Sequence, residues 1–223
     1  VDGVDLIVDT YDRSSQDSYT GVYQLRIAID EQGNGRISGV PLPLLAEGQY
    51  HGPISISPNQ DKLVFPVHDS QKPGLSAGIV APPNLLKLRR LAGPGSSIVQ
   101  TIFAAPTEFE FLGPRLEWVD NQRLLVTRSR FADSEALAPD SFAATRIRIP
   151  PEGEVQVETY RLPGQGSLID YVACRLDRSA LLVVDDAAVG LMLLAWDDNG
   201  EPRPLYRLPS LFAAAQLCWQ TPD

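Results

Sequence analysis

The sequence predicts an all-β fold, and three observations support this prediction. Of the 223 residues, 43% are hydrophobic and 21% are charged, which is typical of a globular chain with a core of its own. The 17 glycines and 19 prolines are scattered along the chain, so few stretches can hold an uninterrupted helical period. Short runs rich in Val, Ile, Leu, Tyr and Trp recur between Gly, Pro, Asn and Asp, as strands joined by turns do.

The predicted strands follow one another along the whole chain. In order they are Asp5–Asp9, Val22–Ile29, Ile37–Pro41, Ile54–Ser57, Lys62–Val67, Ser76–Ala81, Val99–Ala104, Leu116–Val119, Arg123–Thr127, Ala144–Ile149, Val155–Leu162, Val172–Arg175, Ala180–Val184, Leu191–Trp196, Pro204–Leu208 and Ala215–Trp219. Only Asn84–Leu91 and Ser210–Ala215 favour a helix, and both segments are short. We therefore expect helices to be minor elements at most.

A strand–turn–strand unit repeats along the chain. It is clearest in Ile54–Phe65, whose turn is Ser-Pro-Asn-Gln-Asp. Leu116–Val126 has the same plan with a turn one residue shorter, and Val172–Val183 is a third copy. Leu217–Asp223 is the first half of a fourth copy. Since two more strands follow each complete unit, the repeats predict four-stranded antiparallel sheets.

The best-defined copy resembles a known repeat. Ser57-Pro58-Asn59-Gln60-Asp61-Lys62-Leu63-Val64-Phe65 resembles the repeat of TolB-like and WD40-like β-propellers, with Asn59-Gln60 where that family prefers Asp-Gly. The resemblance implies a single propeller domain over residues 1–223, in which each second strand is a nearly continuous apolar run. Its blades would be residues 1–46 plus 212–223, 52–106, 108–163 and 167–209.

The two chain ends allow two interpretations of this propeller. The N-terminal blade lacks a first strand, and the C-terminal segment Ala215–Trp219 is a first strand without a blade. If these ends pair, four blades close into a ring and no bare sheet edge remains. Alternatively, the chain is a fragment of a propeller of about six to eight blades.

The resemblance implies a recognition function. In TolB-like proteins the propeller is a protein-binding module of the bacterial cell envelope, which implies a non-catalytic, monomeric scaffold for a protein partner in an extracytoplasmic setting. In prolyl-oligopeptidase-like enzymes a similar repeat gates a separate hydrolase. A small propeller hydrolase or lyase would require paired carboxylates at the channel, and Glu117 is the sole acid among the first-strand positions. No catalytic residue is therefore assigned.

The composition limits the classes of partner that we expect for this protein. The net charge is −9, and no basic cluster stands out beyond Lys87, Arg89 and Arg90, which argues against nucleic acid. The apolar runs Ala180–Val184 and Val189–Trp196 are far shorter than the ~20 residues of a membrane-spanning helix.

Metal and thiol chemistry has little support. Cys174 and Cys218 lack zinc-ligand spacing and read as buried free thiols, and His51 and His68 read as turn residues. Acids follow several second strands, and equivalent loops of a propeller converge on one face. These acids are Asp9, Asp12, Asp17, Asp69, Asp133, Asp185 and Asp186. They form either a calcium or other cation site or ordinary turns, and no other cofactor is expected.

Four further patterns are weighed against structural roles. Gly74-Leu75-Ser76-Ala77-Gly78 matches a nucleophile elbow, but a turn precedes it and prolines follow, so a hairpin is favoured. Asp30–Gly35 and Asp197–Gly200 resemble calcium loops but read as hairpin turns. The tryptophans, Trp118, Trp196 and Trp219, read as packing between blades. The long connections Phe131–Ala143 and Pro82–Ser97 are the expected places for a partner surface.

Overall fold

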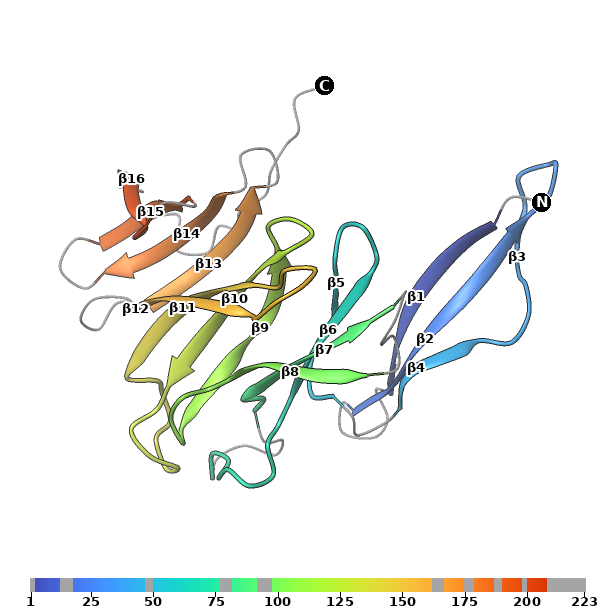
Figure 1. Ribbon diagram of the computed structural model, residues 1–223. Helices are drawn as coiled ribbons and strands as arrows, with labels where there is room; N and C mark the ends of the chain where they lie inside the picture. Colours follow the sequence, from blue (N-terminus) through green and yellow to red (C-terminus); the bar gives the residue numbers. More distant parts are fainter. Residues whose placement is uncertain are drawn as a thin grey trace. The chain divides into compact units, whose positions relative to one another are not determined.

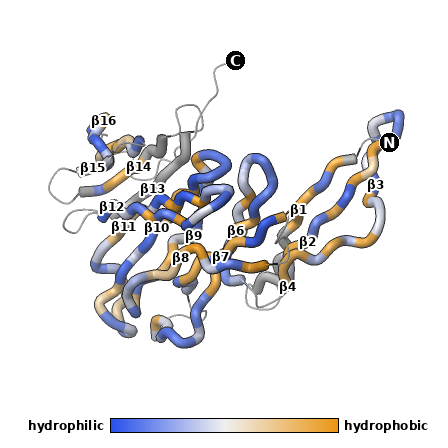
Figure 2. The backbone as a smooth tube through the Cα atoms, viewed as in Figure 1, coloured by the Kyte–Doolittle hydropathy of each residue, from blue (hydrophilic) through white to orange (hydrophobic). Residues whose placement is uncertain are grey.

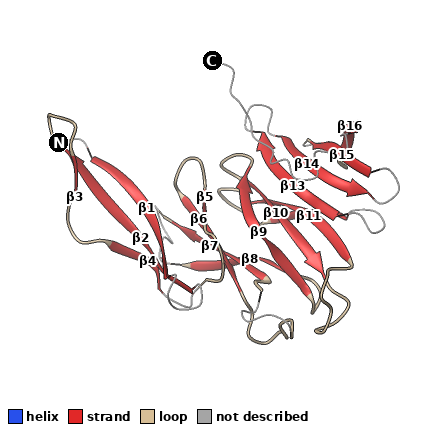
Figure 3. Cartoon of the chain, turned by 180° about the vertical axis from the view of Figure 1, so that it is seen from behind, coloured by secondary structure: helices blue, strands red, loops and turns tan. Residues whose placement is uncertain are grey.

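A computed structural model describes residues 3–12, 18–46, 50–76, 82–91, 98–161, 167–174, 179–186, 190–197 and 200–207 of this chain. It divides into two compact units, Val1–Gly52 and Pro53–Asp223. Every regular element in the described ranges is a β-strand (Figures 1 and 3). Those ranges accordingly hold no helix that could cross a membrane. The predicted all-β class is confirmed, whereas the predicted helix Ser210–Ala215 and strand Ala215–Trp219 lie outside the described residues.

The first unit is one antiparallel sheet. Its strands are β1 (Gly3–Asp12), β2 (Ser18–Ile29), β3 (Gly35–Ile37) and β4 (Leu42–Ala46). β1 pairs with one edge of β2, while β3 and β4 pair one after the other with the opposite edge. The single strand predicted over Ile37–Pro41 is therefore wrong. The chain leaves the sheet after β3 because Gly39 takes a left-handed conformation, with φ of 84°, and Pro41 has no N–H to donate.

The second unit contains three four-stranded antiparallel sheets, each with its strands in chain order. The first sheet is β5 (Ser55–Ile56), β6 (Lys62–Val67), β7 (Leu85–Arg90) and β8 (Val99–Ala104). The middle sheet is β9 (Glu110–Trp118), β10 (Arg123–Arg130), β11 (Ser141–Arg148) and β12 (Gln156–Arg161). The last sheet is β13 (Ser167–Cys174), β14 (Ser179–Asp186), β15 (Gly190–Trp196) and β16 (Arg203–Arg207). None of the sheets closes on itself within the described ranges.

The third strand of the first sheet differs from the prediction. The segment Asn84–Leu91, predicted as a helix, contains β7, and Ser76 lies in a turn instead of starting a strand. Leu86 and Leu88 of β7 are buried while their neighbours Leu85, Lys87 and Arg89 are half-exposed, which is the two-residue period of a strand. The four leucines of this segment also fit a helical spacing. Pairing of the segment with β6 and β8 decides in favour of a strand.

The middle sheet is covered on both faces, as alternate residues of β10 show. Leu124 and Val126 belong to a core shared with the first sheet, whose members there include Val64, Leu86 and Phe103. Leu125, between them, belongs to a core shared with the last sheet, including Leu182 and Trp196. Figure 2 shows the apolar stretches of these strands. We call the Leu124 side the first face of the middle sheet and the Leu125 side its second face.

The second strands are buried as the sequence predicts. All six residues of β6 are buried, and the same is true of the first four residues of β10. The first strands of consecutive sheets touch, since β5 contacts β9 and β9 contacts β13. Ser55 Oγ donates a hydrogen bond to the Leu116 carbonyl across 2.9 Å. The predicted pairing of the chain ends stays a prediction, because residues 212–223 are not among those described.

Candidate functional site

The sheets of the second unit have two ends that differ in character. Short turns at residues 57–62, 119–123 and 149–155 form what we call the turn end. The longer segments 68–84 and 131–140 form what we call the loop end, because β6 and β10 both run from the first set to the second.

The turn that carries the family-like repeat is held by Ser57. Its buried Oγ accepts a hydrogen bond from the Lys62 N–H across 3.0 Å and lies 2.9 Å from Oδ1 of Asn59 and of Asp61. Gln60 takes a left-handed conformation with φ of 58°, as a glycine at this position would without strain. Gln60 thus adopts in this turn a backbone conformation that glycine favours.

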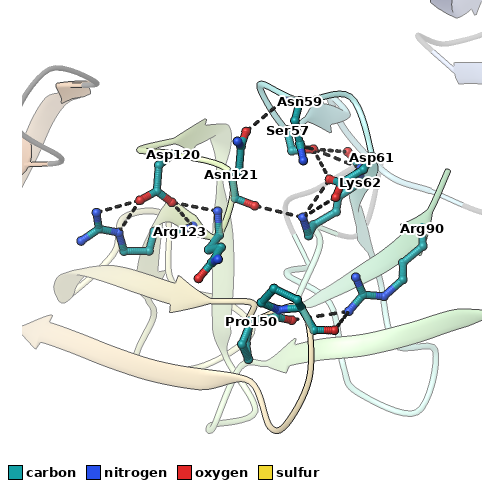
Figure 4. Close-up of polar contacts among 11 residues, drawn as sticks. Ser57, Asn59, Asp61, Lys62, Arg90, Asp120, Asn121, Arg123 and Pro150 are labelled. Atoms are coloured by element: carbon teal, nitrogen blue, oxygen red, sulfur yellow. Dashed lines mark hydrogen bonds and ion pairs between the residues drawn. The ribbon is translucent and has the colours of Figure 1, made fainter. Parts of the chain in front are cut away.

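This turn is joined to the next sheet through Asn121 (Figure 4). The Asn59 N–H donates to Asn121 Oδ1 across 2.9 Å, and the buried Lys62 Nζ donates to the Asn121 carbonyl across 3.0 Å. Lys62 Nζ also lies 2.7 Å from Asp61 Oδ1. Burial acts to raise the pKa of Asp61, but hydrogen bonds from Lys62 and Ser57 outweigh it and hold the pKa below its usual value. These polar groups satisfy one another, so their role is to fix adjacent sheets.

At the loop end, the segments after β6 and β10 meet. The Ser76 N–H donates to the Ser134 carbonyl across 2.8 Å, and Ser76 Oγ donates to Glu135 Oε1 across 2.6 Å. Loops at equivalent positions of two sheets therefore converge. Asp69 N–H donates to Oδ1 of the buried Asn84, which ties the first of these loops to its own sheet.

The loop end also has a hollow of about 250 Å³ beside the 131–140 segment. Polar, apolar and charged groups line it: Thr107, Glu108, Phe109, Arg130, Phe131, Ala132 and Asp140. Arg130 and Asp140 form an ion pair with an N–O distance of 3.2 Å. Their hydrogen bond lowers the pKa of Asp140 and raises that of Arg130. Phe131 packs edge-on against the buried Phe111, which anchors the segment on the middle sheet.

The pattern Gly74–Gly78, for which the sequence favours a hairpin over a nucleophile elbow, has no elbow geometry in its described part. Gly74, Leu75 and Ser76 lie outside any strand, and the Ser76 hydroxyl is engaged with Glu135. His68 directly follows β6, and its Nδ1 lies 2.9 Å from the Pro82 carbonyl oxygen. His51 is likewise outside any strand. Both histidines thus occupy the connecting segments that the sequence predicts.

The predicted acidic loops are partly strands. β1 extends through Asp9 to Asp12, and β14 extends through Asp185 to Asp186, because both strands are longer than predicted. Asp69 and Asp133 do lie in loops, and Asp17 falls outside the described residues. Among the described side chains, no group of three metal-binding residues comes together. Calcium binding therefore stays a prediction.

The predicted hairpin turns are confirmed where described. Asp30 follows β2 and accepts hydrogen bonds from the N–H groups of Gln32 and Asn34, and those from Asn34 are the main cause of its lowered pKa. Asp197 and Gly200 lie between β15 and β16. The connection predicted over Phe131–Ala143 is shorter, since β11 begins at Ser141, and the one predicted over Pro82–Ser97 contains β7.

Two of the three tryptophans follow the predictions, and the predicted burial of the two thiols stays a prediction. Trp118 and Trp196 are buried in the two cores of the second unit. Trp219 and Cys218 lie outside those ranges, and Cys174 ends β13. Glu117 is paired with Arg115 across 2.7 Å. It is not the only acid in the first strands, because β9 begins at Glu110 and β13 includes Asp170.

Two groups of charged residues were missed by the sequence reasoning. Glu110 and Arg128 form a buried ion pair with an N–O distance of 2.6 Å. Arg123, Arg146 and Arg148 line one pocket at the turn end. A signal for the second group does exist, since Arg146 and Arg148 are two positions apart in a predicted strand and must share a face. Lys87, Arg89 and Arg90, noted from the sequence, instead lie along β7.

Comparison with models of known protein families and with curated proteins finds no match for this sequence.

Proposed function

We propose that the chain is a non-catalytic recognition module of the β-propeller type that binds a protein partner in an extracytoplasmic, bacterial setting. One observation carries the proposal. Consecutive four-stranded antiparallel sheets stack face to face with their first strands in contact, β5 against β9 and β9 against β13. Blades that converge on a propeller axis have this arrangement.

The packing favours a rigid scaffold over a mobile catalytic cleft. Both faces of the middle sheet are packed against a neighbouring sheet, with Leu124 and Leu125 fully buried on opposite sides. The turn-end bonds through Asn121 and the loop-end bonds through Ser76 join the first sheet to the middle one at both ends of the strands. Such a frame holds its loops in fixed positions, which lowers the entropy lost on binding.

The loop end supports the recognition role. Its 131–140 segment exposes Leu137, whose side chain is 88% accessible, beside a hollow that offers both charged and aromatic groups. Binding residues are found disproportionately on loops that a rigid scaffold positions. We place the partner surface of the module there.

A site-specific cross-linking experiment tests the proposal. The full chain, with a photoreactive phenylalanine analogue in place of Leu137, is irradiated in its native cells. We expect a discrete cross-linked protein, identified by mass spectrometry. The matched control carries the analogue at Gln100, an exposed position of β8 away from the loop end. Cross-links from neither position, or the same products from both, would contradict a partner surface at the loop end.

A further inference from the structure

A second pocket, at the turn end of the middle sheet, has a composition unlike the rest of this acidic chain. It measures about 220 Å³, and the charged residues that line it are Asp120, Arg123, Arg146, Arg148 and Glu158. Three arginines thus face two carboxylates in a protein whose net charge is −9. Gln156 adds a side-chain amide to the same wall.

The strand register places these side chains on the second face of the middle sheet. Arg123 of β10 is the cross-strand partner of Arg148 of β11, and Arg148 is in turn the partner of Gln156 of β12. Arg146 is two residues from Arg148 and pairs with Glu158. Like charges directly opposite each other in a sheet are destabilising. The sheet therefore carries a repulsive Arg123–Arg148 pair that folding alone does not require.

Two of the three arginines are held in place by the chain itself. Arg123 donates Nε and Nη2 to Asp120 Oδ2 across 2.9 and 2.7 Å. Arg146 binds Glu158 through Nε and Nη2, donates Nη1 to the Asp197 carbonyl across 2.7 Å, and lies 4.8 Å from the centre of the Trp196 ring. Both guanidinium groups are buried and fixed before any ligand arrives.

Arg148 is different. Its side chain is exposed, and no hydrogen-bond or ion-pair partner for it is found among the described residues. Both carboxylates of the pocket are already engaged, Asp120 with Arg123 and Glu158 with Arg146. Among the described residues, the pocket thus keeps one uncompensated positive charge and a guanidinium fork with open N–H groups, next to the exposed Gln156.

We propose that this pocket binds a single carboxylate group, with Arg148 as its bidentate anchor and Gln156 as a second donor. One net positive charge matches a monoanion, and the planar fork of arginine matches a carboxylate. A multiply charged anion would meet Asp120 and Glu158 at close range and the negative field of the whole protein. The carboxylate belongs either to a free small carboxylic acid or to an acidic side chain of a peptide segment.

Titration of the full ¹⁵N-labelled chain, followed by NMR through the arginine Nε–H and Trp196 indole signals, tests the proposal. The probes are propionate, the capped peptide acetyl-Gly-Glu-Gly-amide, their amide counterparts propionamide and acetyl-Gly-Gln-Gly-amide, and inorganic phosphate. We expect saturable shifts with a Kd of about 1 mM for propionate and none for the amides. A peptide that binds about tenfold more tightly than propionate identifies a peptide source, and equal or weaker peptide binding identifies a free acid. No saturation by either carboxylate, equal binding of the amides, or phosphate binding as tight as the carboxylates would overturn the proposal.

Variants assign the binding to this pocket. Arg148→Gln is expected to weaken the carboxylate by about tenfold or more, and Arg148→Lys by less, because lysine keeps the charge but loses the fork. The matched control is Arg161→Gln, an exposed arginine of β12 on the first face of the same sheet. Equal losses in Arg148→Gln and Arg161→Gln, or no loss in Arg148→Gln, would show that the carboxylate binds elsewhere and would overturn the assignment. Since the loop-end partner surface does not involve Arg148, this result is independent of the cross-linking outcome.

Discussion

Arg128 and Arg148, which lie on opposite faces of the middle sheet, have opposite environments. On the first face, Arg128 is buried and fully engaged: it pairs with the buried Glu110, donates to Thr145 and Thr159, and lies 5.1 Å from the centre of the Phe103 ring. On the second face, Arg148 is exposed and has no partner among the described residues. Both residues come from strands of one sheet.

The difference follows from the cost of desolvation. A charge sealed between two sheets must be compensated inside the protein, because water cannot reach it. Burial lowers the pKa of Arg128, and the charge of Glu110 opposes that shift. At the open edge of the second face, water solvates Arg148, so no internal partner is needed and the charge stays available. Internal compensation thus indicates a structural role for Arg128, whereas the charge of Arg148 stays accessible from solvent.

The largest effect on stability is expected from removing the counter-ion of the buried Arg128 on the first face. Glu110→Gln leaves Arg128 charged and without a counter-ion in the core, so we expect the free energy of unfolding to fall by about 3–5 kcal/mol. The control is Glu117→Gln, in the same strand, whose partner Arg115 is partly exposed, with an expected loss of at most about 1 kcal/mol. Urea denaturation measures both. Similar losses of stability in the two variants would contradict the distinction between the buried Glu110–Arg128 pair and the partly exposed Glu117–Arg115 pair.

The buried leucines on the two faces are expected to contribute equally to the free energy of unfolding. Leu124→Ala and Leu125→Ala each empty a fully buried site, one on each face, and each should reduce the free energy of unfolding by about 2–5 kcal/mol. Leu137→Ala, at an 88% exposed position, should change it by less than about 0.5 kcal/mol. A small loss in either core variant, measured by the same denaturation, would mean that its face is not packed against a neighbouring sheet.

A smaller effect on stability is expected from removing the charge of Asp120 at the pocket of the second face. Burial acts to raise its pKa, but hydrogen bonds from the Arg123 side chain and from the N–H groups of Gln122 and Arg123 outweigh it and lower the pKa. A carboxyl group with a lowered folded-state pKa stabilises the protein above its unfolded pKa of about 3.9, and this contribution is lost as the pH falls through the folded value. Asp120→Asn should therefore reduce stability by up to about 1 kcal/mol near pH 7 and by progressively less below about pH 4. Unfolding curves across this pH range measure it, and a loss that does not shrink with falling pH would contradict the charge-based explanation.

Much of the fold could be predicted from local patterns. Lys62–Val67 and Val99–Ala104 match β6 and β8 residue for residue, because apolar runs bounded by turn residues admit little else. The turn predicted after Ser57 is also present, with Gln60 in a left-handed conformation. Local patterns mislead where they fit two structures. The leucines of β7 fit both a helix and a strand, and only the pairing of β7 with β6 and β8 decides that this segment is a strand.

The sites were harder to predict, because they depend on register. Glu110 and Arg128 are far apart in sequence, and nothing local shows that β9 extends back to Glu110 and meets β10 there. Arg146 and Arg148 could be placed on one face from their spacing, but their neighbour Arg123 joins them only through the register of β10 with β11. The converging loops, in contrast, were expected from the repeat, and the Ser76–Glu135 bond joins two of them.

The most direct test of this contrast is the stability of Arg148→Gln in the absence of any carboxylate, measured by urea denaturation beside Arg128→Gln. We expect Arg148→Gln to be as stable as the wild-type chain or slightly more stable, since it removes the repulsion with Arg123 and breaks no bond. The free energy of unfolding of Arg128→Gln should fall by about 3–5 kcal/mol, because the substitution leaves Glu110 buried without a counter-ion. A loss of about 1 kcal/mol or more in Arg148→Gln would show that this arginine serves the fold and would contradict its assignment to binding.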